Sequence, residues 1–555
     1  MESSRRTILK AGLVTGTAAV AATGSAGLLD TRATAAAAPL PSDPFTLGVA
    51  SGEPLPDGFV IWTRLAPSPL DPDGLGGMPS RNVEVLWQVA TDDRFSDVVR
   101  AGSVTASPAW AHSVHVEVSG LKPGREYFYR FRQGPWLSTF GRAVTAPAYG
   151  APVSSMTMAF ASCSNFPAGY FSAYRGLAAE RPDLVLHLGD YLYEGGGNGL
   201  GRNHVGPQTV TLANYRQRHA QYKTDPDLQA AHAASPWLVV WDDHEVDNNY
   251  AGLIAERASE QPGFAERRAA AYRAYYENLP LRRSSVPSGP DLQLYRAIRW
   301  GSLATFHMLD TRQYRADQAC GDGYKDCPDA ADPARSLLGA EQEAWLAEGF
   351  ASSGARWDLL GQQVFFGRRD NNPEAATTVS MDAWDGYPAN RQRVIRAWQD
   401  AGVRNPVVLT GDVHAHWASD VYADFDDPAS GVVGSELVTS SISSGGDGYD
   451  EPTGTHPWAA WNPNIRFWTN LRGYVSTTIT PEALTARYRC VPRVSQPGAA
   501  PFTRATFVIE DGVPGLQEAG VKVPAARRVE RAPGKDRIVR DTIREETGGG
   551  KGYRS

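Results

Sequence analysis

The sequence has few cysteines, no excess of basic residues and, beyond its first 38 residues, no long hydrophobic run. Four cysteines among 555 residues are too few for a disulfide scaffold. A formal net charge of −7 argues against a globally basic nucleic-acid binder, so no nucleic-acid-binding surface is expected. No later segment approaches the roughly 20 apolar residues of a membrane span, so the mature protein is predicted to have no transmembrane segment.

What is abundant indicates a folded, loop-rich protein. Hydrophobic residues make up 42% of the chain and aromatic residues 10%, which excludes disorder over most of its length. The 55 glycines and 39 prolines favour many loops over a helical bundle. At about 150 residues per domain the length suggests roughly three to four units. Local sequence patterns reduce this number of units to a signal, a small sandwich and one large domain, predicted to be catalytic, with a tail.

Residues 1–38 have the layout of an export signal. Arg5 and Arg6 precede a mildly apolar run, Ala11 to Leu29, and the small residues at 33–38 suit signal peptidase. The paired arginines are typical of a twin-arginine signal, which makes the twin-arginine export machinery a partner. The alternative is a membrane anchor, which the Gly-, Ala- and Thr-rich run disfavours. The protein is therefore predicted to be secreted, or associated with the cell wall, after twin-arginine export.

Residues 44–145 are predicted to form an N-terminal β-sandwich domain. Alternating runs such as Gly58–Thr63 and Val83–Val89 indicate short strands between turns. The segment Leu121–Gly124, placed before the aromatic run Tyr127–Phe131, resembles the tyrosine corner of fibronectin type III or immunoglobulin-like sandwiches. Any other small antiparallel sheet is the alternative.

Residues 153–519 alternate between apolar strands and helical segments, which predicts an α/β layered domain with helices outside the sheets. Strands are expected at Met156–Ala161, Asp183–Leu188, Trp237–Trp241, Leu303–Leu309 and Val407–Leu409. Helices are expected at Tyr170–Glu180, Glu266–Glu277, Glu341–Phe350 and Asn390–Ala401. Cys, Asp or His side chains follow the strands, and in such folds the polar residues beyond the carboxyl ends converge on one crevice.

These strand-end side chains have the chemistry of metal ligands. The candidates after successive strands are Cys163, Asp190, Tyr193, Asp243, His244, Asp412, His414 and His416. Carboxylates, a phenolate and a thiolate suit trivalent iron together with a divalent, oxygen-seeking ion. Two ions about 3.5–4 Å apart, bridged by a carboxylate, form the usual clamp for phosphate-ester hydrolysis. A single aspartate at a strand end is more often a turn or capping residue, so only the ordered set of these residues indicates a metal site.

Five segments carry a resemblance to a known family. They are Ala161–Ser164, Leu188–Glu194, Trp241–Val246, Leu309–Arg315 and Thr410–His414. Together they resemble the PhoD-like alkaline phosphatase/phosphodiesterase family, which belongs with the purple-acid-phosphatase-type metallophosphatases. The resemblance spans nearly the whole chain, including the twin-arginine signal and the N-terminal sandwich. Some secreted actinobacterial phospholipases D are similar to this family.

The resemblance implies a ferric ion and one or two calcium ions. The Fe³⁺ ligands would be Cys163, Asp190, Tyr193 and His414. Asp190 would bridge to a Ca²⁺ ion that Asp243 and Asp412 also hold. A second Ca²⁺ would take Asn249 or its neighbour Asn248, and the sequence leaves this choice open.

The resemblance also implies roles in substrate binding. His244 occupies the position of a substrate-contacting histidine and is the predicted catalytic residue, which stabilises the transition state or protonates the leaving oxygen. Arg312 and His416 are candidate phosphate contacts, although Arg312 could equally pair with carboxylates.

The leading hypothesis is a secreted, metal-dependent hydrolase of phosphate mono- and diesters, an alkaline phosphatase/phosphodiesterase in which a metal-bound hydroxide attacks phosphorus. The first alternative is a phospholipase D that releases head groups from phosphatidyl lipids with the same metal site. The second is an extracellular binding protein with a structural metal site. The partners would be small phosphate esters or phospholipid head groups, and the sequence does not choose between them.

Two further predictions concern the remaining cysteines and the C-terminus. Cys320 and Cys327 flank a short loop and are predicted to form a disulfide, whereas Cys490 is predicted to be a buried bystander. Residues 520–555 form a charged tail, in which Pro533 and the following glycine argue against a long helix. A solvated tail is favoured, and the resemblance offers an active-site cover as the alternative.

Overall fold

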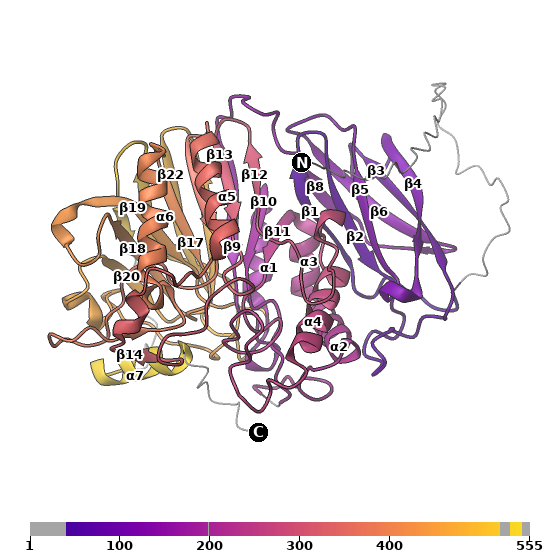
Figure 1. The fold of residues 1–555 in the computed structure, drawn as a ribbon. Coiled ribbons are helices and arrows are strands. Elements are labelled where there is room, and N and C mark those ends of the chain that lie inside the picture. The colour runs from indigo at the N-terminus through magenta and orange to yellow at the C-terminus, as the bar shows by residue number, and fades with distance from the viewer. Residues whose placement is uncertain (1–39, 198, 522–532, 547–555) are drawn as a thin grey trace, which may run out of the picture. The chain divides into compact units, whose positions relative to one another are not determined.

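The computed structural model describes residues 40–197, 199–521 and 533–546 (Figure 1). The predicted signal at residues 1–38 lies outside the described residues. Among the described residues, no helix is long and apolar enough to cross a membrane.

A ten-stranded sheet has the order β24-β23-β22-β21-β9-β10-β11-β1-β2-β5. Its parallel centre consists of β9 (Met156–Ala161), β10 (Leu184–Leu188) and β11 (Pro236–Val240). On one side it continues antiparallel through β21 (Gly473–Ile479), β22 (Ala483–Cys490), β23 (Phe502–Glu510) and β24 (Gln517–Val521). On the other side it continues through β1 (Val49–Leu55), β2 (Gly58–Arg64) and β5 (Ser113–Val118).

A seven-stranded sheet has the order β12-β13-β15-β17-β19-β18-β20. Its strands are β12 (Arg296–Trp300), β13 (Ala304–Met308), β15 (Trp357–Gly361), β17 (Pro406–Thr410), β18 (His416–Tyr422), β19 (Val432–Val438) and β20 (Ile465–Thr469). The strands β13, β15, β17 and β19 run parallel, so their carboxyl ends lie at one edge of the sheet. A short separate pair, β14 (Tyr324–Lys325) and β16 (Val379–Ser380), is antiparallel.

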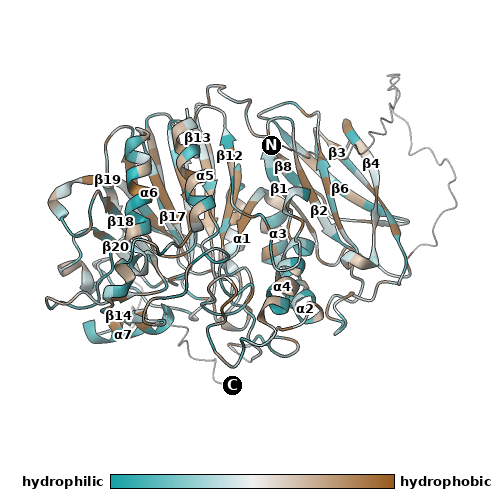
Figure 2. Ribbon diagram, in the orientation of Figure 1, coloured by the Kyte–Doolittle hydropathy of each residue, from teal (hydrophilic) through white to brown (hydrophobic). Residues whose placement is uncertain are grey.

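The two sheets pack against each other and bury the main core. A Cβ atom added at Gly361 of β15 would meet Met308 of β13 and Leu186 of β10, which shows how closely the sheets approach. Successive side chains of a β-strand point to opposite faces of the sheet, so neighbouring residues of the inner strands pack into different layers. Val407 thus joins the core between the sheets, whereas Val408 joins a second core. Strands covered on both faces are hydrophobic along their length, as the brown strands of Figure 2 show.

Helices cover the outer face of each sheet. The helices α1 (Ser172–Glu180), α2 (Leu212–Lys223), α3 (Pro226–Ala234) and α4 (Phe264–Asn278) pack against the ten-stranded sheet. The helices α5 (Gly339–Ser352) and α6 (Pro388–Asp400) pack against the seven-stranded sheet through the second core. The result is a layered arrangement of helices, sheet, sheet and helices, which agrees with the predicted α/β layers.

The N-terminal segment forms a separate five-stranded sheet that packs on β1, β2 and β5. Its strands are β3 (Val83–Ala90), β4 (Val98–Ala106), β6 (Glu126–Gln133), β7 (Trp136–Leu137) and β8 (Gly141–Val144). The facing strand β1 pairs in parallel with β11 at the centre of the ten-stranded sheet, with Ser51 opposite Pro236. One layer of the N-terminal sandwich is therefore continuous with the central sheet, a pairing that no local sequence pattern indicates.

The turn before β6 is bound to a tyrosine of that strand. The hydroxyl of Tyr127, a buried residue, accepts a hydrogen bond from the backbone N–H of Lys122 over 2.9 Å. The Leu-x-Pro-Gly segment thus places the chain reversal where a tyrosine hydroxyl can bind it.

Tyr127→Phe tests this contact. The variant keeps the ring in the core but leaves the Lys122 amide without its acceptor, so we expect the free energy of unfolding to fall by about 1 kcal/mol. Urea denaturation measures the change. Tyr149→Phe is the control, because Tyr149 is 62% exposed. Equal denaturation midpoints for the two variants would contradict the expectation.

Candidate metal site

The predicted ligands come from the carboxyl ends of both sheets. Each of three strands is followed, two residues beyond its end, by a predicted ligand: β9 by Cys163, β10 by Asp190 and β17 by Asp412. Asp242 lies in the same position after β11, followed by Asp243. The backbone joins these loops, because Cys163 N–H donates to the carbonyl of Gly189 over 3.1 Å. The parallel strands thus bring ligands that are distant in sequence to one place.

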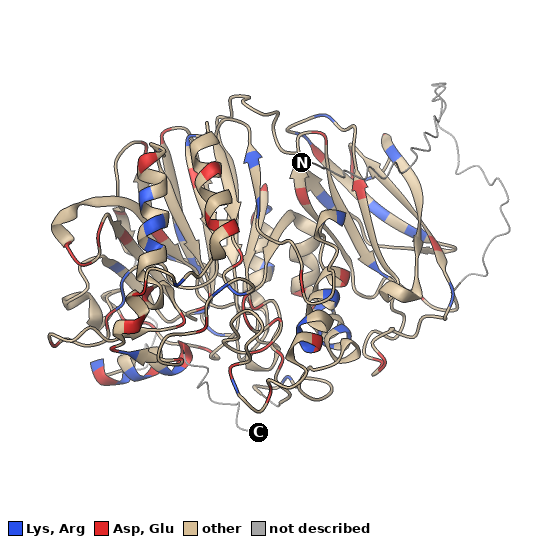
Figure 3. Ribbon diagram, viewed as in Figure 1, with Lys and Arg blue, Asp and Glu red and all other residues tan. Residues whose placement is uncertain are grey.

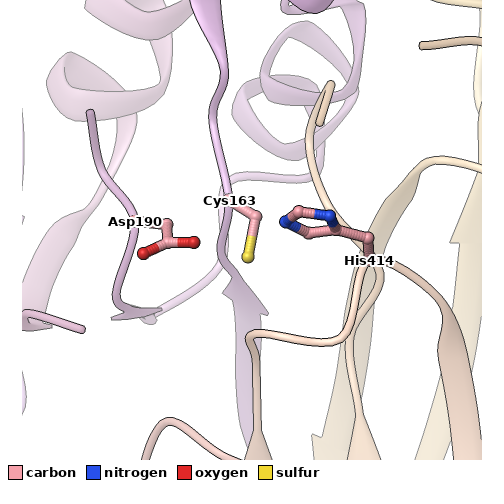
Figure 4. Close-up of side chains that lie close together, drawn as sticks. All are labelled: Cys163, Asp190 and His414. Atoms are coloured by element: carbon pink, nitrogen blue, oxygen red, sulfur yellow. The ribbon is translucent and has the colours of Figure 1, made fainter. Parts of the chain in front are cut away.

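Among the residues that the structure describes, three groups of side chains could each hold a metal ion. They are Cys163 with Asp190 and His414, Asp190 with Asp243 and His244, and Asp242 with Asp243 and Asp412; within each group the ligand atoms lie within 4.8 Å of one another. Figure 4 shows Cys163 between Asp190 and His414, with the three side chains close together. Because Asp190 and Asp243 each belong to two groups, the groups describe adjacent positions that share carboxylates.

Tyr193 belongs to the same site. Its hydroxyl donates to Asp190 Oδ2 over 2.8 Å and lies 2.9 Å from His414 Nε2. The structure thus brings together the four residues predicted to bind iron. Asp242 is an acidic member of the site that the sequence interpretation missed, although its position directly before Asp243 was visible.

The backbone of the site is strained. Among the described residues, eleven that are not glycine have positive φ, and five of these are predicted ligands: Cys163, Asp190, Asn249, Asp412 and His414. This region of conformation is unfavourable for residues with a Cβ atom. Such strain concentrates at functional sites, where the surrounding structure holds it in place.

The charges of the site fit a bound cation. Oxygen atoms of Asp190, Asp242 and Asp243 are buried without a hydrogen-bond partner. Burial raises the pKa of Asp190 and of Asp412 well above the ordinary value, and neighbouring aspartates raise it further. A polyvalent cation removes both costs, because it provides ligands for the free oxygens and compensates the negative charge.

The remaining donors agree with this interpretation. Burial, followed by the charge of Asp190, raises the pKa of the Cys163 thiol and of the Tyr193 phenol, so both need a metal ion to ionise. Burial lowers the pKa of His414 to about 3, which keeps this imidazole neutral and able to bind a metal.

His244 has a carboxylate partner that the sequence interpretation also missed. Its Nδ1 lies 2.7 Å from Glu194 Oε2, and Glu194 Oε1 accepts the backbone N–H of Asn248 over 3.2 Å. Burial lowers the pKa of His244, but Glu194, Asp243 and Asp190 outweigh burial, and the pKa lies well above the ordinary value. Glu194 follows Tyr193 directly, so the loop that supplies the phenol also orients the histidine.

Arg312 does not serve as a free phosphate contact. Its guanidinium is fully buried and donates to both oxygens of Asp382 over 2.8 Å and to Asp242 over 2.5 Å. The predicted phosphate contact is therefore wrong for Arg312, and the alternative of pairing with carboxylates holds. Its positive charge stabilises the neighbouring carboxylates of Asp242, Asp243 and Asp382.

The other predicted residues lie close by. Asn249 N–H donates to Asp243 Oδ2 over 2.7 Å, whereas Asn248 bonds to Glu194. His416 begins β18, where its Nδ1 accepts the N–H of Ser440 over 2.9 Å and its buried Nε2 has no partner. It belongs to none of the three ligand groups, and its phosphate contact remains a prediction.

Glu245 joins the loops that follow β10 and β11. One oxygen accepts the N–H of Asp190 over 3.1 Å and of Asp242 over 2.9 Å, and the other accepts the N–H of Tyr191 over 2.5 Å. The carboxylate thereby satisfies three buried amides of the ligand loops, which are otherwise outside the regular ladders of the sheet.

The C-terminal segment departs from the favoured solvated tail over its described part. Residues Lys535–Glu546 form α7, which carries acidic and basic residues along its length (Figure 3). Ile538 is buried, Glu546 pairs with Arg369, and Glu545 lies 3.3 Å from Arg472, whose guanidinium also donates to the His414 carbonyl. The helix docks because its apolar side meets a hydrophobic cluster while its carboxylates meet buried arginines.

The cysteines divide as expected. Cys320 and Cys327 form a disulfide, and Cys490 is buried and free.

Similarity to known proteins identifies the family of this chain. Residues 158–488 match the PhoD-like phosphatase family, and residues 31–147 match its N-terminal domain. Alkaline phosphatase D of Bacillus subtilis (strain 168) is 52% identical over 484 residues, which cover 86% of this chain and 82% of that protein. The chain belongs to the PhoD-like phosphatase family. A solved structure of PhoD has a TM-score of 0.87 at 49% identity and covers 92% of this chain and 99% of that chain. As a member of this family, the chain is a phosphoric ester hydrolase.

Glu245→Ala tests the anchoring of the ligand loops. Loss of the carboxylate leaves three buried amides without acceptors, so we expect a destabilisation of roughly 3 kcal/mol and a lower thermal midpoint. Differential scanning fluorimetry measures it. The control Glu348→Ala removes an exposed carboxylate from α5. If both variants melted at the same temperature, Glu245 would have no anchoring role.

Proposed function

We propose that this phosphatase is metal-dependent and hydrolyses both phosphate monoesters and diesters. The observation that supports it is the sharing of Asp190 and Asp243 between adjacent ligand groups. Two cations that share a carboxylate are suited to a phosphoryl group, because each can neutralise a different oxygen.

The proposed metals follow from the donor types. Cys163, Asp190, Tyr193 and His414 would hold Fe³⁺, since a thiolate and a phenolate stabilise the ferric state. Asp190, Asp243 and Asp412 would hold Ca²⁺, and Asn249 would serve a second Ca²⁺. When bound, these ions would supply an acidified water molecule and compensate charge on the phosphate oxygens.

His244 is the proposed catalytic residue of the chain. Glu194 binds Nδ1, which leaves Nε2 as the nitrogen available to a substrate. A raised pKa keeps a proton at Nε2, and that proton can stabilise a phosphate oxygen or pass to the leaving oxygen. Glu194 acts through His244 and is a positioning residue.

A substrate panel tests this function. We expect purified protein to release nitrophenol from a nitrophenyl phosphate and from a bis-nitrophenyl phosphate, and to lose both activities on chelation. Phosphatidylcholine with calcium serves as the third substrate. Choline release that far exceeds ester hydrolysis would favour the phospholipase D alternative. Equal activity before and after chelation, and in Asp190→Asn, would contradict metal dependence.

Glu194→Gln tests the orientation of His244. The substitution keeps the size of the side chain but removes the charge that holds the imidazolium. We expect kcat to fall about 10- to 100-fold with little change in KM or metal content, as for other groups that orient active-site ligands. Steady-state kinetics with a nitrophenyl phosphate measures this split, with Glu348→Gln as the control. A variant that changes KM alone would assign Glu194 to substrate binding instead.

Four further proposals concern the domains, the export route and the C-terminal helix. The sandwich at 44–145 is fibronectin- or immunoglobulin-like, as its tyrosine corner supports, and the catalytic domain spans 153–519. The protein is exported by the twin-arginine route, as Arg5 and Arg6 support. The C-terminal helix α7 covers the site, supported by the contacts from Glu545 through Arg472 to His414.

A further inference from the structure

Asn249 is held at three points beside the metal site. Its N–H donates to Asp243, and its carbonyl accepts Gln318 Nε2 over 2.9 Å. Its side-chain Nδ2 donates to Asp322 Oδ2 over 2.7 Å. Its φ is +47°, so the backbone is held in the left-handed region as well. The nearby Asp243 and one distant loop, which supplies both Gln318 and Asp322, therefore determine where this residue lies.

The contact with Asp322 determines which end of the amide faces away from it. A carboxylate only accepts hydrogen bonds, so it selects the NH₂ end of Asn249. The carbonyl oxygen Oδ1 then lies on the other side of the amide, and within the described residues no protein donor bonds to it. Asn249 is buried. An amide oxygen that accepts no hydrogen bond from the protein is a suitable ligand for a hard cation such as Ca²⁺.

Asp322 itself is held by a closed loop. The disulfide between Cys320 and Cys327 spans a separation of seven residues and has Asp322 inside it. Within this loop, Asp322 Oδ1 accepts the N–H of Gly323 over 2.6 Å, and the Gly323 carbonyl accepts the N–H of Met381 over 3.0 Å. The pairing of β14 with β16 anchors the loop further. The disulfide thus restrains a side chain that contacts a predicted ligand 73 residues away.

The geometry points to Asp322 as a positioning residue that presents the Asn249 oxygen to calcium, with the Cys320–Cys327 disulfide holding Asp322 in place. This inference rests on the proposed metal-dependent function. It deepens that function, since it makes oxidation of one loop a condition for full calcium affinity. Asp322 acts through Asn249 and does not itself bind the ion.

Calcium binding to Asp322→Ala is the first test. Protein stripped with a calcium chelator is titrated with Ca²⁺ alone by isothermal titration calorimetry. We expect the Kd to rise about 10- to 100-fold, because loss of an outer partner leaves the ligand misoriented. Asp322→Asn keeps an acceptor oxygen and should recover most of the affinity. Asp326→Ala is the matched control, since it removes an exposed carboxylate from the same loop and should bind as wild type does.

A double-mutant cycle separates positioning from direct binding. In an Asn249→Ala background, Asp322→Ala should cause no further loss of calcium affinity. The Cys320→Ser/Cys327→Ser variant should weaken binding in the same direction, and adding Asp322→Ala to it should cost less than in wild type. Serine variants are preferred to a thiol reductant, because free thiols bind metals themselves.

Two results would overturn the inference. Equal Kd values for Asp322→Ala and Asp326→Ala would show that Asp322 has no role. A full loss from Asp322→Ala in the Asn249→Ala background would make Asp322 a direct ligand. Neither result depends on phosphatase activity, which the substrate panel measures separately. Failure of the proposed function and failure of this inference are therefore distinguishable.

Discussion

The structure depends on four aspartates that lie together at one point between the two sheets. They come from three strand ends: Asp190, Asp242 and Asp243 are almost fully buried, and Asp412 is partly buried with a pKa well above its ordinary value. Burying like charges together is costly unless positive charge accompanies them. Arg312 and His244 provide part of that charge from the protein, and free carboxylate oxygens leave room for cations to provide the rest.

This constraint explains the surrounding architecture. The predicted ligands come from both sheets, so the face-to-face packing of β10 with β13 and β15 positions the candidate metal site as well as the core. Glu245 holds the loops after β10 and β11 by their amides, and one of these amides belongs to Asp190, whose backbone has the unfavourable positive φ. The sheet packing and the Glu245 hydrogen bonds thus stabilise the fold and also position the predicted ligands.

Local patterns predict the buried strands well. The strand predicted at Met156–Ala161 coincides with β9, and the residues that follow it are those of the site. Continuous apolar runs are reliable because strands covered on both faces leave no polar positions. The same argument explains why the antiparallel strands β21 to β23 were not identified: their half-buried alternation is a weaker signal.

Long-range pairings account for what the sequence could not predict. The partner of His244 is Glu194, 50 residues away, and only the fold brings the two together. Arg312 has the residue type of a phosphate contact, but Asp382 occupies its guanidinium, and nothing near Arg312 in the sequence indicates this. The docking of α7 likewise depends on buried arginines from other elements rather than on its own composition.

The central claim is that the buried aspartates require bound cations, and elemental analysis of the purified protein tests it most directly. Inductively coupled plasma mass spectrometry should find one iron and at least one calcium per chain in wild type. Asp190→Asn should lose both, because Asp190 belongs to two ligand groups. If wild-type protein stripped of metal were as stable and as active as the untreated protein, the result would contradict this account.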